Sequence, residues 1–146
     1  MEFKNIVCPV GDEELFEVTD VAAAYLSRIT DANLILVNVV EKWYRSQAMV
    51  TGSQEWQDIH KQWLDEGRQL LENEALKIKK MGGKHIETVL REGDAGYEII
   101  ALAGERKADL IIMATRHYSP IGKFFHGSVI DKVTRKSPCP ILWLFK

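Results

Sequence analysis

The sequence predicts an α/β fold, a doubly wound parallel sheet with helices on both faces. Its strongest strand signals are two nearly continuous apolar runs, LILVNVV at 34–40 and ADLIIMA at 108–114, which are typical of strands buried on both faces. Segments with apolar residues three and four positions apart lie between such runs, and this spacing indicates amphipathic helices. The chain has 146 residues, 46% hydrophobic and 27% charged, so we expect a single globular domain over 1–146.

The first half of the chain is predicted to form two strands and two helices. NIVCPV at 5–10 is a short apolar strand stopped at Gly11. A helix follows with Asp12 as its expected N-cap, and its predicted apolar face contains Leu15, Val18, Ala22, Leu26 and Ile29. After the strand at 34–40, residues 41–54 show no period and predict a long loop. The next helix is long, and its predicted inner face contains Trp56, Ile59, Trp63, Leu70, Leu71, Ala75, Ile78 and Met81.

The second half is predicted to add three strands and two helices. HIETVL alternates like a strand, REGDAG turns the chain, and Asp94 is expected to cap a short helix. The strand at 108–114 leads into ATRHYSPIGKFFHGSV at 114–129, where a polar loop is followed by a helix. ILWLF at 141–145 is the last strand. Repeated alternation of this kind requires right-handed crossovers and a parallel sheet.

The polar loop falls where such a sheet binds ligands. In doubly wound sheets, ligands lie beyond the carboxyl ends of the strands, where the strand order reverses. PVGDE after the first strand and ATRHYSP after the fourth both reach that edge. Gly127 and Ser128 begin the helix after the loop, and backbone N–H groups at a helix start can hold a phosphate.

Three other nucleotide or signalling folds lack their motifs here. PVGDEE is not the dinucleotide fingerprint G-x-G-x-x-G, and no Walker loop G-x-x-x-x-G-K-[ST] occurs. A two-component receiver domain shares the element order but needs an Asp ending its third strand and a Lys ending its fifth. Here the third strand ends in VLREGD, and the fifth offers only the terminal Lys146.

The sequence predicts neither a metal site nor a catalytic residue. The spacings H-x3-H and H-E-x-x-H are absent among the four histidines, His60, His85, His117 and His126. Cys8 lies beside Pro9 and Cys139 lies between two prolines, so we expect packed, reduced thiols, although geometry does not exclude a Cys–His pair. No G-x-S-x-G elbow occurs.

Charge and hydropathy narrow the set of partners. The formal net charge of −2 gives no reason to expect nucleic acid or an anionic membrane as partner. MEFKNIVCPV is not a signal peptide, and no apolar run approaches the roughly 20 residues that span a bilayer. We therefore expect a cytoplasmic protein. Bases outnumber acids over 116–146, which favours an anionic ligand near the polar loop.

Four segments together resemble the universal stress protein family over essentially the whole chain: NIVCPVGDEE, LILVNVV, TVLREGDAGYEIIALAGERKADLIIMATRH and GSVIDKVTRKSPCPILWL. The resemblance implies a five-stranded sheet in the order 3-2-1-4-5, of the adenine nucleotide alpha hydrolase-like type. It also implies a homodimer paired through the last strand, which would cover an apolar edge that otherwise favours aggregation. We expect that interface to contain Ile141, Leu142, Trp143, Leu144 and Phe145.

Nucleotide-binding members of the family carry G-x2-G-x9-G-[ST] after the fourth strand. The spacing is intact here, but Ala114 and His117 replace the first two glycines, ahead of Gly127 and Ser128. Ala114 adds one methyl group. A side chain at position 117 costs roughly 1 kcal/mol if the backbone there needs a positive φ. The loop is therefore a degenerate version of the family motif.

The resemblance also implies where an adenine nucleotide would bind. Next to the ribose or base would lie Pro9, Val10, Gly11 and Asp12, with Val39 on the adenine side. The phosphates would be held by the segments that contain Ala114, Thr115, Arg116, His117, Lys123, Gly127, Ser128 and Val129. We expect a dimeric stress-response or regulatory factor without catalysis. The alternative is a protein that binds ATP or AMP, with Mg²⁺, as a switch or a slow ATPase.

Overall fold

The computed structural model describes residues 2–11, 13–41, 54–115 and 127–146, and within them five strands form one parallel sheet. The strands are β1 Asn5–Pro9, β2 Asn33–Glu41, β3 Ile86–Gly93, β4 Leu110–Thr115 and β5 Ile141–Phe145. Their order is β3-β2-β1-β4-β5, and all four pairings are parallel. This confirms the predicted sheet and its order.

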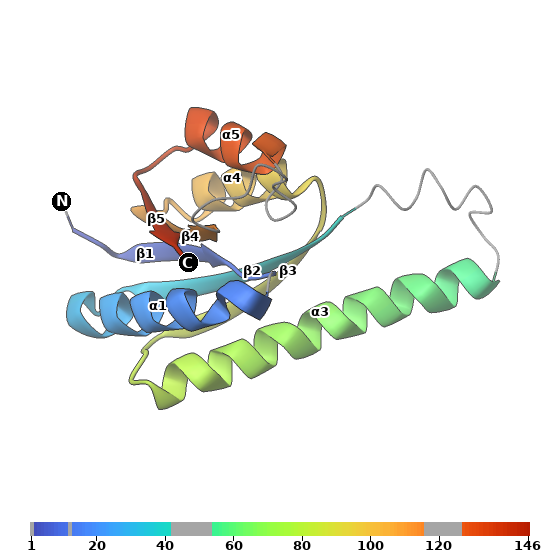
Figure 1. Cartoon of the computed structure of the whole chain (residues 1–146), viewed down its shortest axis with the longest axis horizontal. Coiled ribbons are helices and arrows are strands. Elements are labelled where there is room, and N and C mark those ends of the chain that lie inside the picture. The colour runs from blue at the N-terminus through green and yellow to red at the C-terminus, as the bar shows by residue number, and fades with distance from the viewer. Residues whose placement is uncertain (1, 12, 42–53, 116–126) are drawn as a thin grey trace.

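The helices form a layer on each face of the sheet (Figure 1). Those in the described ranges are α1 Phe16–Thr30, α3 Gln54–Lys80, α4 Ala95–Glu105 and α5 Gly127–Lys136. Ile6 and Cys8 of β1 face the layer of α1 and α3, whereas Val7 between them faces the layer of α4 and α5. Successive side chains of a strand point to opposite faces, so each central strand contributes to both cores.

Helix α1 begins later than predicted, and its buried face agrees only in part with the predicted one, since Leu15 is buried and Ala22 and Leu26 pack against the core. A 3-10 turn over Glu13–Leu15 precedes it, and Leu15 rather than Asp12 is the N-cap of the α-helix. The buried side chains are Phe16, Thr19, Asp20, Ala23, Ala24 and Ser27. Ile29, predicted to be on the inner face, is 56% exposed. The buried hydroxyls of this face donate to helix carbonyls, Thr19 Oγ1 to Leu15 O at 3.0 Å, which makes their burial tolerable.

Helix α3 has two halves with different surroundings. Its fully buried residues, Gly67, Leu71, Glu74 and Ile78, all lie in the second half. The first half continues past the end of the sheet (Figure 1). Trp56 and Trp63 lie in that half, half-buried and edge to face with ring centroids 6.3 Å apart. The two tryptophans therefore pack on each other along α3, whereas Ile59, also predicted on the inner face, is 36% exposed.

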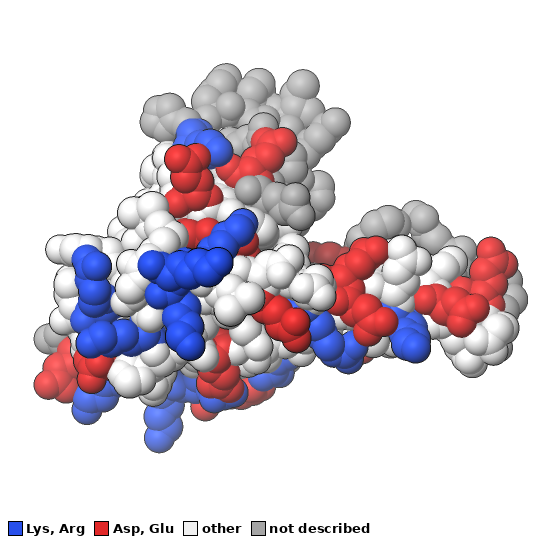
Figure 2. Space-filling view, turned by 90° about the horizontal axis from the view of Figure 1, so that it is seen from below, with Lys and Arg blue, Asp and Glu red and all other residues white. Residues whose placement is uncertain are grey.

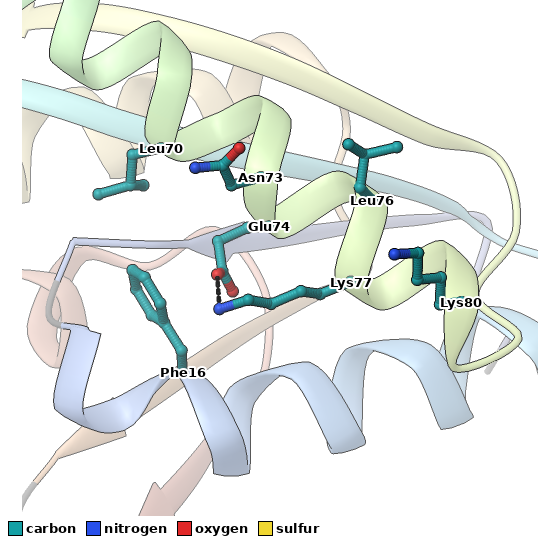
Figure 3. A pocket seen from close by; sticks show the side chains of 7 residues that line it. All are labelled: Phe16, Leu70, Asn73, Glu74, Leu76, Lys77 and Lys80. Atoms are coloured by element: carbon teal, nitrogen blue, oxygen red, sulfur yellow. Dashed lines mark hydrogen bonds and ion pairs between the residues drawn. The ribbon is translucent and has the colours of Figure 1, made fainter.

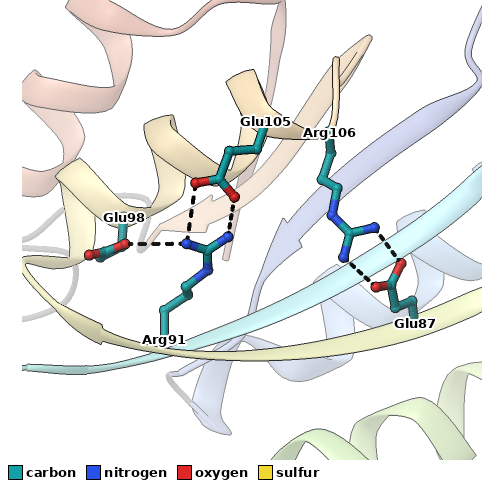
Figure 4. A network of polar contacts seen from close by, with 5 residues as sticks. All are labelled: Glu87, Arg91, Glu98, Glu105 and Arg106. Atoms are coloured by element: carbon teal, nitrogen blue, oxygen red, sulfur yellow. Dashed lines mark hydrogen bonds and ion pairs between the residues drawn. The ribbon is translucent and has the colours of Figure 1, made fainter.

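Charged side chains fasten the edge strand β3 to helix α4 (Figure 4). Arg91 forms an ion pair with Glu105 and lies 3.9 Å from Glu98, both on α4. Arg106, just after α4, donates from Nη1 to Oε2 of Glu87 at 3.0 Å. Glu87 and Arg91 lie on the same face of β3 as Val89, which packs under α4, and their charges on an edge strand discourage pairing with another strand.

The turn between β3 and α4 follows the predicted capping. Gly93 ends the strand with φ +148°, and Asp94 is the N-cap of α4. Its carboxylate accepts from the Tyr97 N–H at 2.8 Å and from Lys132 Nζ at 2.9 Å. These two hydrogen bonds, that from Lys132 first, hold the pKa of Asp94 below its usual value.

Candidate functional site

The ends of β1 and β4 form one rim of the sheet. The two strands are neighbours in register, Ile6 beside Leu110 and Val7 beside Ile111. Because the strands are parallel, the residues that follow them emerge at the same edge. Gly11 after β1 and Thr115 at the end of β4 therefore lie at a common rim, as the sequence predicted.

The backbone after β1 is held by an amide side chain from β2. Val10 N–H donates to Val37 O at 2.8 Å, and Asn38 Nδ2 donates to Val10 O at 2.9 Å. Gly11 itself is exposed, and among the described residues a Cβ placed there would meet only Asn38 Nδ2, at 3.9 Å. Of the part of the chain that the structure describes, little besides Asn38 therefore approaches Gly11 beside its fixed backbone. Asn38 was missed by the sequence analysis, although it is the only polar residue of LILVNVV.

The predicted site residues divide between the two faces of the sheet. Val39 and Val129 pack in the same cluster as Met113, on the face of α4 and α5. Val10 packs on the opposite face. Ala114 follows Met113 along β4, so it points to the face opposite Met113, and only 3% of it is exposed. Its extra methyl group is therefore absorbed by the protein interior.

The rest of the predicted site is only partly visible. Pro9 is buried, and Thr115 is half-buried with its carbonyl accepting from Lys146 N–H at 3.1 Å. Helix α5 begins at Gly127, as predicted, and continues through Ser128. The remaining predicted residues, Asp12, Arg116, His117 and Lys123, lie outside the described residues.

A second polar cluster, which the sequence analysis missed, lies between α1 and α3 (Figure 3). Glu74 is 1% exposed and accepts from Lys77 Nζ at 2.9 Å, while the Lys77 ammonium lies 5.6 Å from the centroid of the Phe16 ring. Asp20 of α1 is 5% exposed and within hydrogen-bonding reach of Glu74. The spacing that buries Leu71 and Ile78 also buries Glu74, and this was the available signal.

The buried acids need a shared proton. Asp20 Oδ1 and Glu74 Oε2 are buried and receive no donor while both groups are ionised. Burial, reinforced by the hydrogen bond and negative charge of Glu74, raises the pKa of Asp20 to about 8. A proton on Asp20 then supplies the missing donor. Burial also raises the pKa of the neighbouring Cys8 thiol above its usual value, so Cys8 is a packed thiol rather than a nucleophile.

Beside this cluster runs a surface groove of about 510 Å³. Its walls come from α1 and from the second half of α3: Phe16, Leu70, Asn73, Glu74, Leu76, Lys77 and Lys80 (Figure 3). In the part of the chain that the structure describes, no three His, Cys, Asp or Glu side chains gather as metal ligands. No helix in the same ranges is long and apolar enough to cross a membrane.

The sequence matches the model of the Universal stress protein family over residues 2–144. The chain belongs to the universal stress protein family. Among curated proteins, universal stress protein MJ0531 of Methanocaldococcus jannaschii is 29% identical over 143 residues, which are 96% of this chain and 81% of that protein. The family predicted from the sequence is thereby confirmed.

Solved structures of the family share the fold. A universal stress protein in complex with cAMP superposes with a TM-score of 0.72 at 20% identity, covering 99% of this chain and 98% of that one. The universal stress protein from Archaeoglobus fulgidus in complex with dAMP gives 0.70 at 20% identity, with 98% of both chains covered. At this identity the likeness concerns the fold.

Proposed function

We propose that this universal stress protein is a cytoplasmic regulatory factor that binds an adenine nucleotide at the rim of β1 and β4 and does not act through catalysis. The observation that carries the proposal is the rim at Gly11, where Asn38 fixes the backbone and no other side chain of the described residues comes within 4 Å of an added Cβ. Relatives of this fold hold adenine nucleotides, cAMP in one and dAMP in another.

The degenerate loop does not by itself argue against binding. Of the two substituted glycines, Ala114 is 3% exposed and points into the protein, so its methyl group takes no space from a ligand. Arg116, His117, Lys123 and the N–H groups at the start of α5 would then hold the phosphates. The residues nearest the base, Val10, Gly11 and Val39, offer backbone and hydrocarbon, which suits binding rather than chemistry.

Binding is tested by identifying and then titrating the ligand. Mass spectrometry of the native protein should detect a co-purifying adenine nucleotide, and calorimetry should show binding of AMP, cyclic AMP or ATP with Mg²⁺. Gly11→Leu should weaken that binding at least about tenfold, because the new side chain occupies the open rim. Gly104→Leu, at a helix position with no atom within 4 Å of the added Cβ, is the matched control.

The possible results separate the candidate functions. Wild-type protein that binds none of the three nucleotides would overturn the proposal and favour a stress factor without nucleotide, in which His117 blocks the loop. Equal binding by wild type and Gly11→Leu would exclude this rim as the site. Phosphate release from ATP above background, lost in Gly11→Leu, would instead support the slow ATPase.

We also propose that the protein is a homodimer paired through β5. This strand is an edge of the sheet, with Leu142 36% and Phe145 57% exposed, and an uncovered apolar edge is a site of association. Leu142→Lys should give a monomer in sedimentation velocity at micromolar concentration, where wild type sediments as a dimer. Ile29→Lys, at a side chain 56% exposed on α1, should leave the dimer intact. A monomeric wild type would refute this interface.

A further inference from the structure

A row of exposed side chains runs along the whole length of α3. In its first half the row contains Glu55, Ile59, Gln62 and Glu66. In its second half it continues with Gln69, Asn73, Leu76 and Lys80. The steps between them alternate between four and three residues, which is the heptad spacing that keeps side chains on one side of a helix. We call these eight residues the outer row.

The two halves of the outer row are complementary in charge and polarity when they are aligned antiparallel. Glu55 then meets Lys80, and Ile59 meets Leu76. In the middle, Gln62 meets Asn73 and Glu66 meets Gln69. The two residue numbers of every pair have the same sum. This is the relation between facing residues of two antiparallel helices that a twofold axis relates.

We propose that the outer row of α3 is a self-association surface, on which two copies of this chain pair their α3 helices antiparallel about a twofold axis. The pairing places an acid against a base at each end and one apolar layer inside each end. In the middle lie the amides of Gln62, Gln69 and Asn73 and the carboxylate of Glu66 from each helix. It is independent of the β5 edge and of the nucleotide rim.

The shape of the molecule makes room for this pairing. The first half of α3 extends past the sheet (Figure 1), so it is free to reach a second copy. The second half borders the groove lined by Phe16, Asn73, Leu76 and Lys80. A partner helix running antiparallel would bring its Ile59 toward this groove. The side chain of Ile59 is 36% exposed and that of Leu76 is 57% exposed. Contact with a partner helix would bury this apolar surface, which favours association.

Charge supports the same arrangement. The last turn of α3 carries Lys77, Lys79 and Lys80, and blue side chains gather over the end of the molecule where α1 and α3 finish (Figure 2). The projecting half is mostly red in the same view; it carries Glu55, Asp58, Asp65 and Glu66 against Lys61. Antiparallel pairing joins these opposite charges and aligns opposite helix dipoles.

The composition of the outer row favours a second copy and predicts weak affinity. The first half of the outer row is complementary to the second half of the same row in another copy. A twofold axis between two copies produces this match, whereas an unrelated peptide or a lipid surface would not. Only one apolar layer lies in each half, so association should appear at high protein concentration. Concentrations up to about 1 mM are needed to observe contacts of this strength.

The experiment uses sedimentation equilibrium of the full chain over rising concentration. To exclude the proposed β5 pairing, every chain in this experiment also carries Leu142→Lys, and wild type here means that background. Its mass should rise about twofold above its value at high dilution. Glu55→Lys and Lys80→Glu should each remove the rise, because each places like charges at both ends of the pair. An equimolar mixture of the two variants should restore it, since the introduced lysine then faces the introduced glutamate and native Glu55 faces native Lys80.

Two further variants complete the test. Leu76→Asp should remove the rise alone and in every mixture, because it buries a charge against Ile59. Lys136→Glu, an exposed charge at the end of α5, should behave like wild type. The proposal is overturned if wild type shows no rise up to about 1 mM, or if the mixture behaves like its two components. A rise that survives Leu76→Asp would assign the association to another surface.

Discussion

The two faces of the sheet are filled with different chemistry, although the same strands supply both. Under α4 and α5 the buried cluster contains only hydrocarbon and thioether side chains, such as Ile99, Ile111 and Met113. Under α1 and α3 the buried groups include a thiol, Cys8, and the carboxyls of Asp20 and Glu74. Burying ionisable groups is costly unless they are paired or protonated. Among the described residues the buried carboxyls lie only in the layer of α1 and α3, so above pH 5 we expect the pH dependence of stability to come mainly from that layer.

The largest expected effect comes from the face of α4 and α5, where no described buried residue is charged. Ile111 is fully buried there, and Ile111→Ala should lower the free energy of unfolding by about 3 kcal/mol through lost hydrophobic burial and the cavity left behind. The loss should be the same near pH 5 and near pH 8, because no buried member of that cluster titrates. Urea unfolding at the two pH values measures it. A loss that changes with pH would break the contrast between the faces.

A smaller and pH-dependent effect is expected on the other face. The pKa of Asp20 is raised to about 8 in the folded protein, from an ordinary value near 4. Between these values the folded state holds a proton that the unfolded state has released, so stability must fall as pH rises through this window. Asp20→Asn keeps a donor toward Glu74 without titrating. Full linkage over the three pH units from pH 5 to pH 8 is about 4 kcal/mol, and solvent screening should reduce it. The stability of Asp20→Asn relative to wild type should therefore grow by about 2 kcal/mol over this range.

The control for Asp20→Asn is another aspartate on a helix. Asp58 is exposed and accepts from Gln54 Nε2 at 2.9 Å, so Asp58→Asn should follow the wild-type pH dependence. Urea unfolding at several pH values, with the wild type in parallel, gives both curves. If Asp20→Asn changed stability equally at all pH values, the buried acid would not hold a proton in the folded state.

The sequence was sufficient to predict the sheet, but it was not sufficient to predict which side of α1 is buried. Apolar runs such as 34–40 and 108–114 can hardly be anything but buried strands, and the helices between them dictate a parallel sheet. The buried face of α1 was predicted only in part, because a search for regularly spaced apolar residues does not detect polar residues that are buried. Thr19, Asp20 and Ser27 lie on the inner face, where hydrogen bonds satisfy the hydroxyls and proximity to Glu74 raises the pKa of Asp20.

The candidate site was predictable to a similar extent. That Gly11 and Thr115 share a rim follows from the strand order alone. The bracing of Val10 by Asn38 does not, because it depends on which face of β2 meets the loop after β1. The pair of Asp20 and Glu74 joins two helices distant in sequence, and no local pattern reports such a contact. The nucleotide at the rim stays a prediction.

One small residue sets how closely α3 approaches the sheet. A Cβ at Gly67 would lie 2.9 Å from Asn38 Oδ1 and 2.7 Å from Leu90 Cδ1, so glycine lets the helix rest directly on the strands. Asn38 uses its other atom, Nδ2, to hold the carbonyl of Val10. The long helix therefore rests on the same amide that holds the backbone at the rim. A larger residue at position 67 would displace both the helix and the contact that fixes Val10.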